Sequence, residues 1–176
     1  MGICVIDTDI FNFINHHMQN SFFDWIMPLA SSGGIIIWIV IAAAIFFWRP
    51  PNGKITALLT VAALILSSFL VNDFLKEIIG RPRPFLTLTD IRLLIEKPNS
   101  FSFPSGHSAN SFACATVIAK KIKPLAPLAF LTAFIIAFSR VYVGVHYPID
   151  VVGGVIIGLI CGLLVLYVEN HYCKTK

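Results

Sequence analysis

Residues 151–167 read VVGGVIIGLICGLLVLY, a stretch without a charged side chain. A helix needs about 20 predominantly apolar residues to cross the hydrocarbon core of a bilayer, and this stretch approaches that length. Glycines recur at positions 154, 158 and 162, which places small residues along one helix face. The stretch therefore predicts a transmembrane helix that packs closely against a neighbouring helix.

Four further apolar stretches precede it. They cover residues 22–48, 55–75, 107–119 and 125–142. The first is overlong and is interrupted at residues 31–34 by Ser-Ser-Gly-Gly, so it is either a kinked span or an interfacial piece joined to a span. The third is short and carries Ser108, Asn110 and Ser111, which we expect to face the other helices. The sequence predicts an all-α integral membrane bundle with five to six transmembrane helices.

The composition excludes an ordinary soluble domain. Hydrophobic residues make up 57% of the 176-residue chain, the mean hydropathy is +0.82, and only 12% of residues are charged, against about a quarter in soluble proteins. The net charge of +4 is scattered between apolar stretches, which argues against nucleic-acid binding. The amino terminus lacks the pattern of a cleavable leader, so we expect no removable signal peptide. We interpret residues 1–176 as a single membrane-embedded domain.

Residues 1–20 predict a helix that lies on the membrane rather than across it. Apolar residues recur at helical spacing opposite polar ones: Ile6, Ile10, Phe13, Ile14 and Met18 against Asp7, Asn12 and Asn15. An amphipathic helix of this kind buries its apolar face in the headgroup region. We therefore expect an N-terminal interfacial helix.

Lysine and arginine predict the orientation, because both are retained preferentially on the cytoplasmic side. With alternating spans, one face receives Arg49, Lys54, Lys120, Lys121, Lys123, Lys174 and Lys176, and the other receives Lys76, Arg81, Arg83, Arg92, Lys97 and Arg140. Three residues of the second set, Lys76, Arg83 and Arg140, belong to polar clusters suited to chemistry and are set aside. Seven basic residues then remain on the first face and three on the second. The cluster face should therefore point to the periplasm or exterior of a bacterial inner membrane.

Three polar clusters stand out from the apolar background: Lys76 to Pro84, Pro104 to His107, and Ser139 to Asp150. Charge beside hydrocarbon is costly, so such residues mark a functional site by default. With alternating spans, all three clusters fall at helix ends on one membrane face. The long loop of residues 85–103 lies between the first two clusters and is a candidate lid or lipid-contacting element.

The clusters carry groups suited to a phosphate. Pro104 to His107 is typical of a turn that opens a helix, where unpaired backbone amides and the helix dipole attract an anion. Gly106 would let a phosphate approach the backbone, and Ser105 adds a hydroxyl donor; the alternative is that Ser105 only caps the helix and His107 bonds locally. Positive charge is supplied by Lys76, Arg83 and Arg140. Three other cations are expected to anchor to headgroups or to pair with Asp73 and Glu77: Arg81, Arg92 and Lys97.

His146 and Asp150, four residues apart, suit nucleophilic catalysis. A carboxylate bonded to one imidazole nitrogen fixes the tautomer and leaves the other nitrogen to attack phosphorus. The departing oxygen then needs a proton, for which His107 is the candidate donor. A metal site made of these three residues is the alternative, although the nearby cations would repel a metal ion. We therefore expect no cofactor and no metal.

In order and spacing, the three clusters resemble the signature of the type 2 phosphatidic acid phosphatase superfamily over residues 76–150. The resemblance implies a metal-independent phosphatase in which His146 is the nucleophile, Asp150 orients it and His107 protonates the leaving group. The phosphate ligands that it implies are Lys76, Arg83, Ser105, Gly106 and Arg140. Fuller members usually show six spans, whereas the pattern here predicts five and an interfacial helix.

These observations predict a phosphatase that acts on a lipid monophosphate or diphosphate through a phosphohistidine. Undecaprenyl diphosphate, lipid A phosphate and phosphatidylglycerol phosphate all remain open as substrates, as does the oligomeric state. The alternative is an anion transporter or channel, but its charges should recur through the bilayer depth, whereas here they collect at one face. The related vanadium-dependent haloperoxidases have a similar pocket but are soluble proteins, which the hydrophobicity of this chain disfavours.

Overall fold

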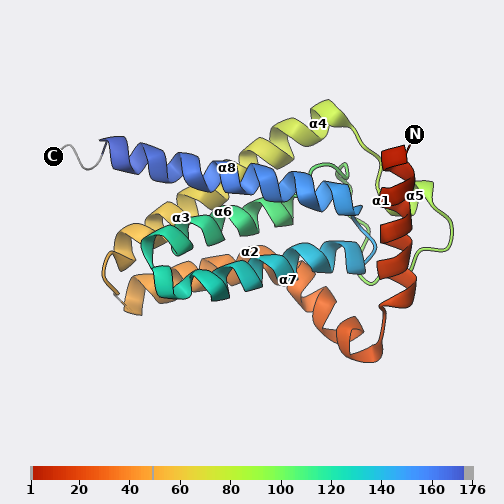
Figure 1. Cartoon of the computed structure of the whole chain (residues 1–176), viewed down its shortest axis with the longest axis horizontal. Helices are drawn as coiled ribbons and strands as arrows, with labels where there is room; N and C mark the ends of the chain where they lie inside the picture. Colours follow the sequence, from red (N-terminus) through yellow and green to blue (C-terminus); the bar gives the residue numbers. More distant parts are fainter. Residues whose placement is uncertain (1, 49, 173–176) are drawn as a thin grey trace.

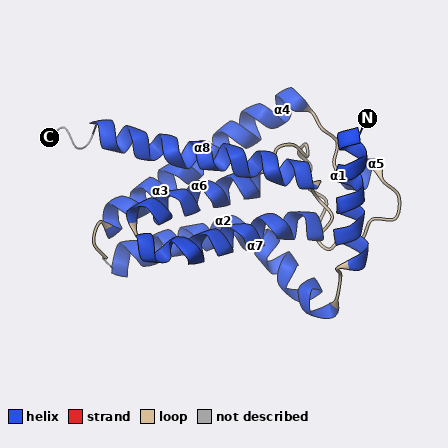
Figure 2. Ribbon diagram, viewed as in Figure 1, coloured by secondary structure: helices blue, strands red, loops and turns tan. Residues whose placement is uncertain are grey.

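The structure, a computed structural model, describes residues 2–48 and 50–172, and all regular elements in this part of the chain are helical (Figure 2). The α-helices are α1 (Gly2–Asn12), α2 (Ser21–Trp48), α3 (Gly53–Ser68), α4 (Lys76–Ile79), α5 (Pro84–Thr87), α6 (Gly106–Lys121), α7 (Ala126–Tyr142) and α8 (Pro148–Tyr172). Stretches of π-helix at Phe13–His17 and Phe69–Leu75 continue α1 and α3, and a 3₁₀ turn at Lys123–Leu125 precedes α7. The predicted all-α fold is confirmed.

The long helices run side by side, and α1 lies across one end of the bundle (Figure 1). Residues 31–34 do not interrupt α2, which is one continuous helix with Pro28 inside it. Its first turns run obliquely to the rest (Figure 1), as expected near a proline, which cannot donate a backbone hydrogen bond and crowds the preceding turn. The kinked-span interpretation of this stretch is therefore the correct one.

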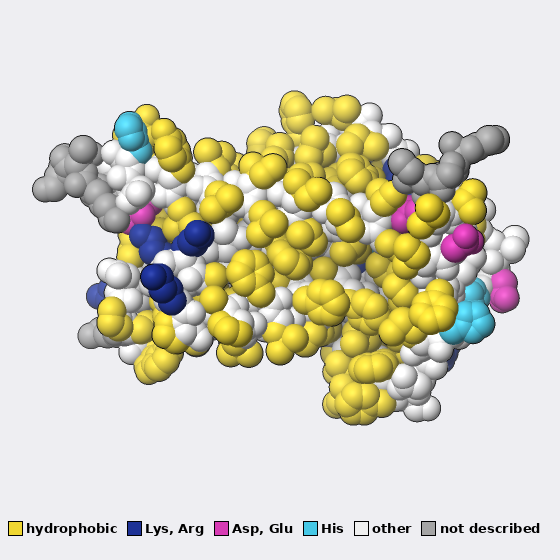
Figure 3. Space-filling model, in the orientation of Figure 1, with side chains coloured by type: hydrophobic (Ala, Val, Ile, Leu, Met, Phe, Trp, Pro, Cys, Tyr) yellow, Lys and Arg dark blue, Asp and Glu magenta, His cyan; other side chains and the backbone are white. Residues whose placement is uncertain are grey.

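Within residues 2–48 and 50–172, four helical segments are long and apolar enough to cross a membrane: residues 21–48, 53–87, 123–142 and 148–172. Apolar side chains cover much of the flank of the bundle (Figure 3), as expected for a surface that faces lipid. At 16 residues, α6 is shorter than these segments, but it lies in the interior, where it contacts α2, α3, α7 and α8. The chain is an integral membrane protein, and the count of five to six spans stays a prediction.

The basic residues separate towards the two ends of the bundle. Four lysines lie at the end away from α1, where α3 begins and α6 ends: Lys54, Lys120, Lys121 and Lys123. Figure 3 shows basic side chains gathered at this end on the face in view. The other three residues assigned to this face, Arg49, Lys174 and Lys176, lie outside the described part of the chain.

The glycine ridge of α8 packs directly on the backbone of α6, as predicted. A Cβ atom at Gly154 would lie 2.4 Å from the carbonyl oxygen of Ser105, and one at Gly158 would lie 2.3 Å from that of Ala109. Real Cβ atoms do not approach so closely, so only glycine allows this helix spacing. The contact matters for the site because α6 and α8 carry His107 and Asp150 near their amino ends.

Gly158→Ala is expected to destabilise the protein by about 1–3 kcal/mol, the usual cost of overpacking, because the new methyl group would collide with the Ala109 carbonyl. Thermal unfolding in detergent measures this change. Gly33→Ala is the matched control, since its Cβ would make an ordinary 3.6 Å contact with Ile37. Equal melting temperatures for both variants would contradict the tight α6–α8 contact.

The loop between α5 and α6 packs back onto the protein. Leu93, Leu94 and Ile95 join an apolar cluster that includes Met27 and Tyr142. The Leu94 amide also donates to the Val143 carbonyl at 3.2 Å. The apolar run at residues 91–95 is therefore partly buried against the protein, and a lid or lipid-contacting role for this loop stays a prediction.

Two polar side chains of the N-terminal segment, Asp7 and Asn15, face the protein, whereas several of its apolar side chains face outward. Asp7 is 2% and Asn15 0% exposed, whereas Ile6 is 60% and Phe13 58% exposed. The Asn15 side chain pairs with the backbone of Arg92 through two 3.0 Å hydrogen bonds. The polar face of α1 and its π-helical extension is therefore an intramolecular contact, and the apolar face is the one left open.

Candidate active site

The three polar clusters converge at the end of the bundle that α1 crosses. Lys76 Nζ and Arg83 Nη2 both donate to Ser100 Oγ, at 3.2 and 3.0 Å. From the third cluster, His146 Nε2 lies 3.2 Å from Arg83 Nη1. The side chains of Lys76, Arg83 and His146 are all buried. Burial of charged or titratable groups is costly unless they are paired or serve a function.

The contact with Arg83 assigns the tautomer of His146. A guanidinium has only N–H donors, so Nε2 must be the acceptor in this contact and the neutral ring carries its proton on Nδ1. Burial lowers the pKa of His146 well below its usual 6.5, and the positive charges of Arg140, Arg83 and Lys76 lower the pKa further. The imidazole is therefore neutral at physiological pH, with an unprotonated nitrogen facing the cations.

Asp150 lies on the Nδ1 side of the imidazole, but without the direct hydrogen bond that the sequence predicts. Its Oδ2 atom is 3.6 Å from His146 Nδ1, beyond hydrogen-bond distance, and it accepts from Ser102 Oγ at 2.5 Å and from the Tyr147 amide at 2.9 Å. Ser102 Oγ is itself 3.5 Å from His146 Nδ1. Sequence reasoning missed Ser102, although its position in a serine-rich stretch just before Pro104 was a usable signal.

Arg140 completes the cationic side of the site. Its Nη1 atom donates to the Ser31 carbonyl at 3.3 Å and to Ser31 Oγ. Its Nε atom is the only buried side-chain nitrogen or oxygen without a partner among the described residues. Because an orphaned buried donor is costly, this N–H is suited to a phosphate oxygen.

His107, in the first turn of α6, belongs to the same group. It lies within electrostatic range of Lys76, Arg83, Arg140 and His146. Its ring also packs on α2, where a Cβ at Gly34 would come within 2.8 Å of His107 Cδ2. The Ser31-to-Gly34 stretch, which from the sequence looked like a helix interruption, therefore supports both a cation and a histidine of the site.

Ser105 and Gly106 have structural roles at the start of α6. Ser105 Oγ accepts from the Ser108 amide at 3.4 Å and from Ser108 Oγ at 2.9 Å, which is the capping role named as the alternative. Its own O–H can still donate. A Cβ at Gly106 would lie 2.7 Å from Asn72 Oδ1, so helix packing is one physical reason for this glycine. Their phosphate-binding roles stay predictions.

Arg81 reaches the site, contrary to expectation. Its Nη1 donates to Asp150 Oδ1 at 2.5 Å, and its Nη2 donates to Asp7 Oδ2 at 2.6 Å. Arg92 pairs with Asp24 at 2.8 Å, a carboxylate other than the two that were expected. The usable signal for Arg81 was its position two residues before Arg83.

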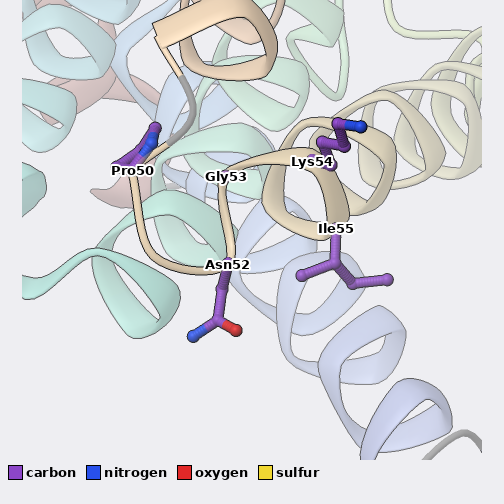
Figure 4. A pocket seen from close by; sticks show the side chains of 5 residues that line it. All are labelled: Pro50, Asn52, Gly53, Lys54 and Ile55. Atoms are coloured by element: carbon purple, nitrogen blue, oxygen red, sulfur yellow. The ribbon is translucent and has the colours of Figure 1, made fainter.

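The hollow shown in Figure 4 lies away from the site residues described so far. This hollow of about 430 Å³ is lined by Pro50, Asn52, Gly53, Lys54 and Ile55 (Figure 4). It sits at the loop between α2 and α3, at the far end of the bundle from His146. Within the described ranges, no three His, Cys, Asp or Glu side chains are grouped so as to hold a metal ion.

A comparison with known protein families matches residues 56–172 to the PAP2 superfamily. The chain belongs to this superfamily. The match covers all three clusters and the helices that carry them. The predicted family is therefore confirmed.

Curated relatives extend over most of the chain. An undecaprenyl-diphosphatase from Sulfolobus acidocaldarius is 27% identical over 93% of this chain and 79% of its own length. A lipid A 4'-phosphatase from Bacteroides thetaiotaomicron is 31% identical over 94% of this chain and 77% of its own length. Phosphatidylglycerophosphatase B from Bacillus subtilis is 36% identical over 77% of this chain and 68% of its own length. The names of these relatives agree with the predicted enzyme class, a membrane lipid phosphatase.

Two solved structures share the fold. The crystal structure of Aquifex aeolicus LpxE superposes with a TM-score of 0.80 at 31% identity, covering 91% of this chain and 94% of that one. The first transmembrane PAP2 type phosphatidylglycerolphosphate phosphatase from Bacillus subtilis gives a TM-score of 0.70 at 29% identity, covering 97% and 88%. The fold and the family agree.

Proposed function

We propose that this protein hydrolyses a phosphomonoester or diphosphate of a membrane lipid and that His146 Nε2 is the nucleophile. The observation that carries the proposal is the neutral imidazole whose unprotonated Nε2 faces Arg83, with Asp150 behind its Nδ1–H. A neutral nitrogen among cations suits attack on an anionic phosphate, because the cations attract the substrate and keep the nucleophile unprotonated. Family membership and the named relatives support a lipid as the phosphate carrier.

In the first step, Lys76, Arg83 and Arg140 bind the phosphate oxygens, and Ser105 and Gly106 contribute a hydroxyl and a backbone amide at the start of α6. His146 Nε2 forms a bond to phosphorus while the bond from phosphorus to the leaving oxygen breaks. The ring becomes cationic, and the Asp150 carboxylate stabilises that charge through the Nδ1 side.

His107 acts in both halves of the reaction. It gives its proton to the oxygen that leaves with the lipid, or to the bridging oxygen of a diphosphate. The neutral His107 then accepts a proton from the water that attacks the phosphohistidine. The bond between Nε2 and phosphorus breaks, inorganic phosphate leaves, and both histidines return to their starting forms.

The placement of the site supports a surface reaction. The cationic end lies beneath α1 and its π-helical extension, whose apolar residues Ile6, Ile10 and Phe13 are exposed and would rest in the lipid interface. The lysines at the other end of the bundle support a cytoplasmic position for that end. The site would then open to the periplasm or exterior of a bacterial inner membrane, with α6 as the fifth span.

A phosphate-release panel tests this function with purified protein in detergent. We expect release from at least one of undecaprenyl diphosphate, lipid A phosphate and phosphatidylglycerol phosphate. We expect EDTA to leave the rate unchanged because the proposed chemistry uses only groups of the protein and water. The matched blank is His146→Ala protein purified in parallel. Loss of activity in EDTA that one metal ion restores would contradict the mechanism. Anion uptake by proteoliposomes without phosphate release would favour a transporter instead.

A further inference from the structure

The catalytic carboxylate shares one arginine with a second, distant carboxylate. Arg81 joins Asp150 Oδ1 at 2.5 Å to Asp7 Oδ2 at 2.6 Å, so the guanidinium lies between the two acids. The side chains of Asp7 and Asp150 are 1% and 0% exposed, and that of Arg81 is 22% exposed. The guanidinium also lies over the Tyr147 ring, 4.2 Å from its centroid, which holds the arginine from a third direction.

Asp7 makes a second contact that links α1 to the helix carrying Asp150. Its Oδ1 atom accepts from the Ile149 amide at 2.8 Å. Ile149 lies in the first turn of α8, where backbone amides have no partner inside the helix. Each carboxylate oxygen of Asp7 therefore has a separate role: one holds the start of α8, and the other holds Arg81.

We propose that Asp7 and Arg81 are positioning residues that orient Asp150 and keep the group beside His146 negatively charged, so that α1 is part of the catalytic machinery. An Arg81–Asp150 pair alone would carry no net charge and would stabilise a cationic imidazole less than a free carboxylate does. With Asp7 included, two carboxylates share one guanidinium, and the three groups carry one net negative charge. This inference rests on the proposed function, because it requires that Asp150 assists His146.

The charge argument separates the proposal from an ordinary structural ion pair. Breaking a structural pair would lower stability and disturb all steps alike. A partner that acts through Asp150 should instead lower kcat, with little change in KM, because the substrate phosphate contacts Lys76, Arg83 and Arg140 rather than Arg81. Its effect should also depend on Asp150 being present.

The test compares Asp7→Asn, Arg81→Gln and Arg81→Lys, with Asp9→Asn as the matched control because Asp9 is an exposed acid on the same helix. We expect Asp7→Asn and Arg81→Gln to lower kcat by about 10- to 100-fold, the scale of loss when a residue that orients a metal-bound histidine is replaced. Arg81→Lys should recover part of that loss, and Asp9→Asn should match the wild type. Melting temperatures identify any variant whose loss comes from unfolding.

The decisive comparison places Arg81→Gln in the Asp150→Asn background and measures the residual turnover above the His146→Ala blank. We expect no further loss there, because the residue through which Arg81 acts has already been changed. A loss as large as in the wild-type background would overturn the proposal. Wild-type kcat in Asp7→Asn and Arg81→Gln alongside inactive Asp150→Asn would overturn it while leaving the proposed function intact. Full activity of His146→Ala would instead refute the proposed function.

Discussion

His146→Ala should lower kcat by about 10⁴-fold or more, the scale seen when a catalytic nucleophile is removed. Its Nε2 atom is the neutral nitrogen that faces Arg83, and Asp150 lies on the Nδ1 side of the same ring. Phosphate release from the lipid substrate measures the loss. Rapid acid-free quenching with labelled substrate should also show covalent phosphate on the wild type and none on the variant.

His16→Ala is the matched control, because His16 is exposed on the π-helical turn after α1 and should be replaceable without loss. Retention of full turnover by His146→Ala would contradict the assignment of the nucleophile. Loss of turnover with covalent phosphate still captured would move the nucleophile to another residue.

His107→Ala should lower kcat for a lipid phosphate by about 10²- to 10⁴-fold, the usual contribution of a general acid. A lipid alkoxide is a poor leaving group and needs the proton, whereas p-nitrophenolate leaves without one. The expected signature is therefore a much smaller loss in phosphoenzyme formation with p-nitrophenyl phosphate than with the lipid.

The same variant should accumulate phosphohistidine from p-nitrophenyl phosphate, because in the proposed mechanism His107 also activates the water of the second step. An initial burst of p-nitrophenol, followed by slow turnover, is the measurement. An equal loss for both substrates, without a burst, would assign His107 to phosphate binding rather than to proton transfer. His16→Ala again serves as the control.

Much of the site could be predicted because its residues are conspicuous against apolar neighbours. Lys76, Arg83, Arg140, His146 and Asp150 interrupt or flank stretches that otherwise suit a membrane, and the lengths of those stretches place the interruptions at one end of the bundle. The structure brings all five together there. Span length is a local property of the chain, so a topological argument from it can succeed without coordinates.

The supporting residues could not be predicted by the same reasoning. Ser31 bonds to Arg140 across 109 positions, Ser102 to Asp150 across 48, and Asp7 to Arg81 across 74. None of these partners is unusual where it stands in the sequence. Asp7 looked like the polar face of an interfacial helix, and only its burial against Arg81 and α8 gives it another role.

The sequence by itself determined the helical membrane class, the face on which the charged groups collect and the identity of the groups suited to phosphate, because hydrophobic length and the cost of charge near lipid act on each segment separately. The tertiary structure alone decided how those groups are held: the tautomer of His146, the orphaned N–H of Arg140 and the arginine shared by Asp7 and Asp150. Each of these depends on hydrogen-bond geometry between segments far apart in the chain, and distances of this kind arise only when the helices pack.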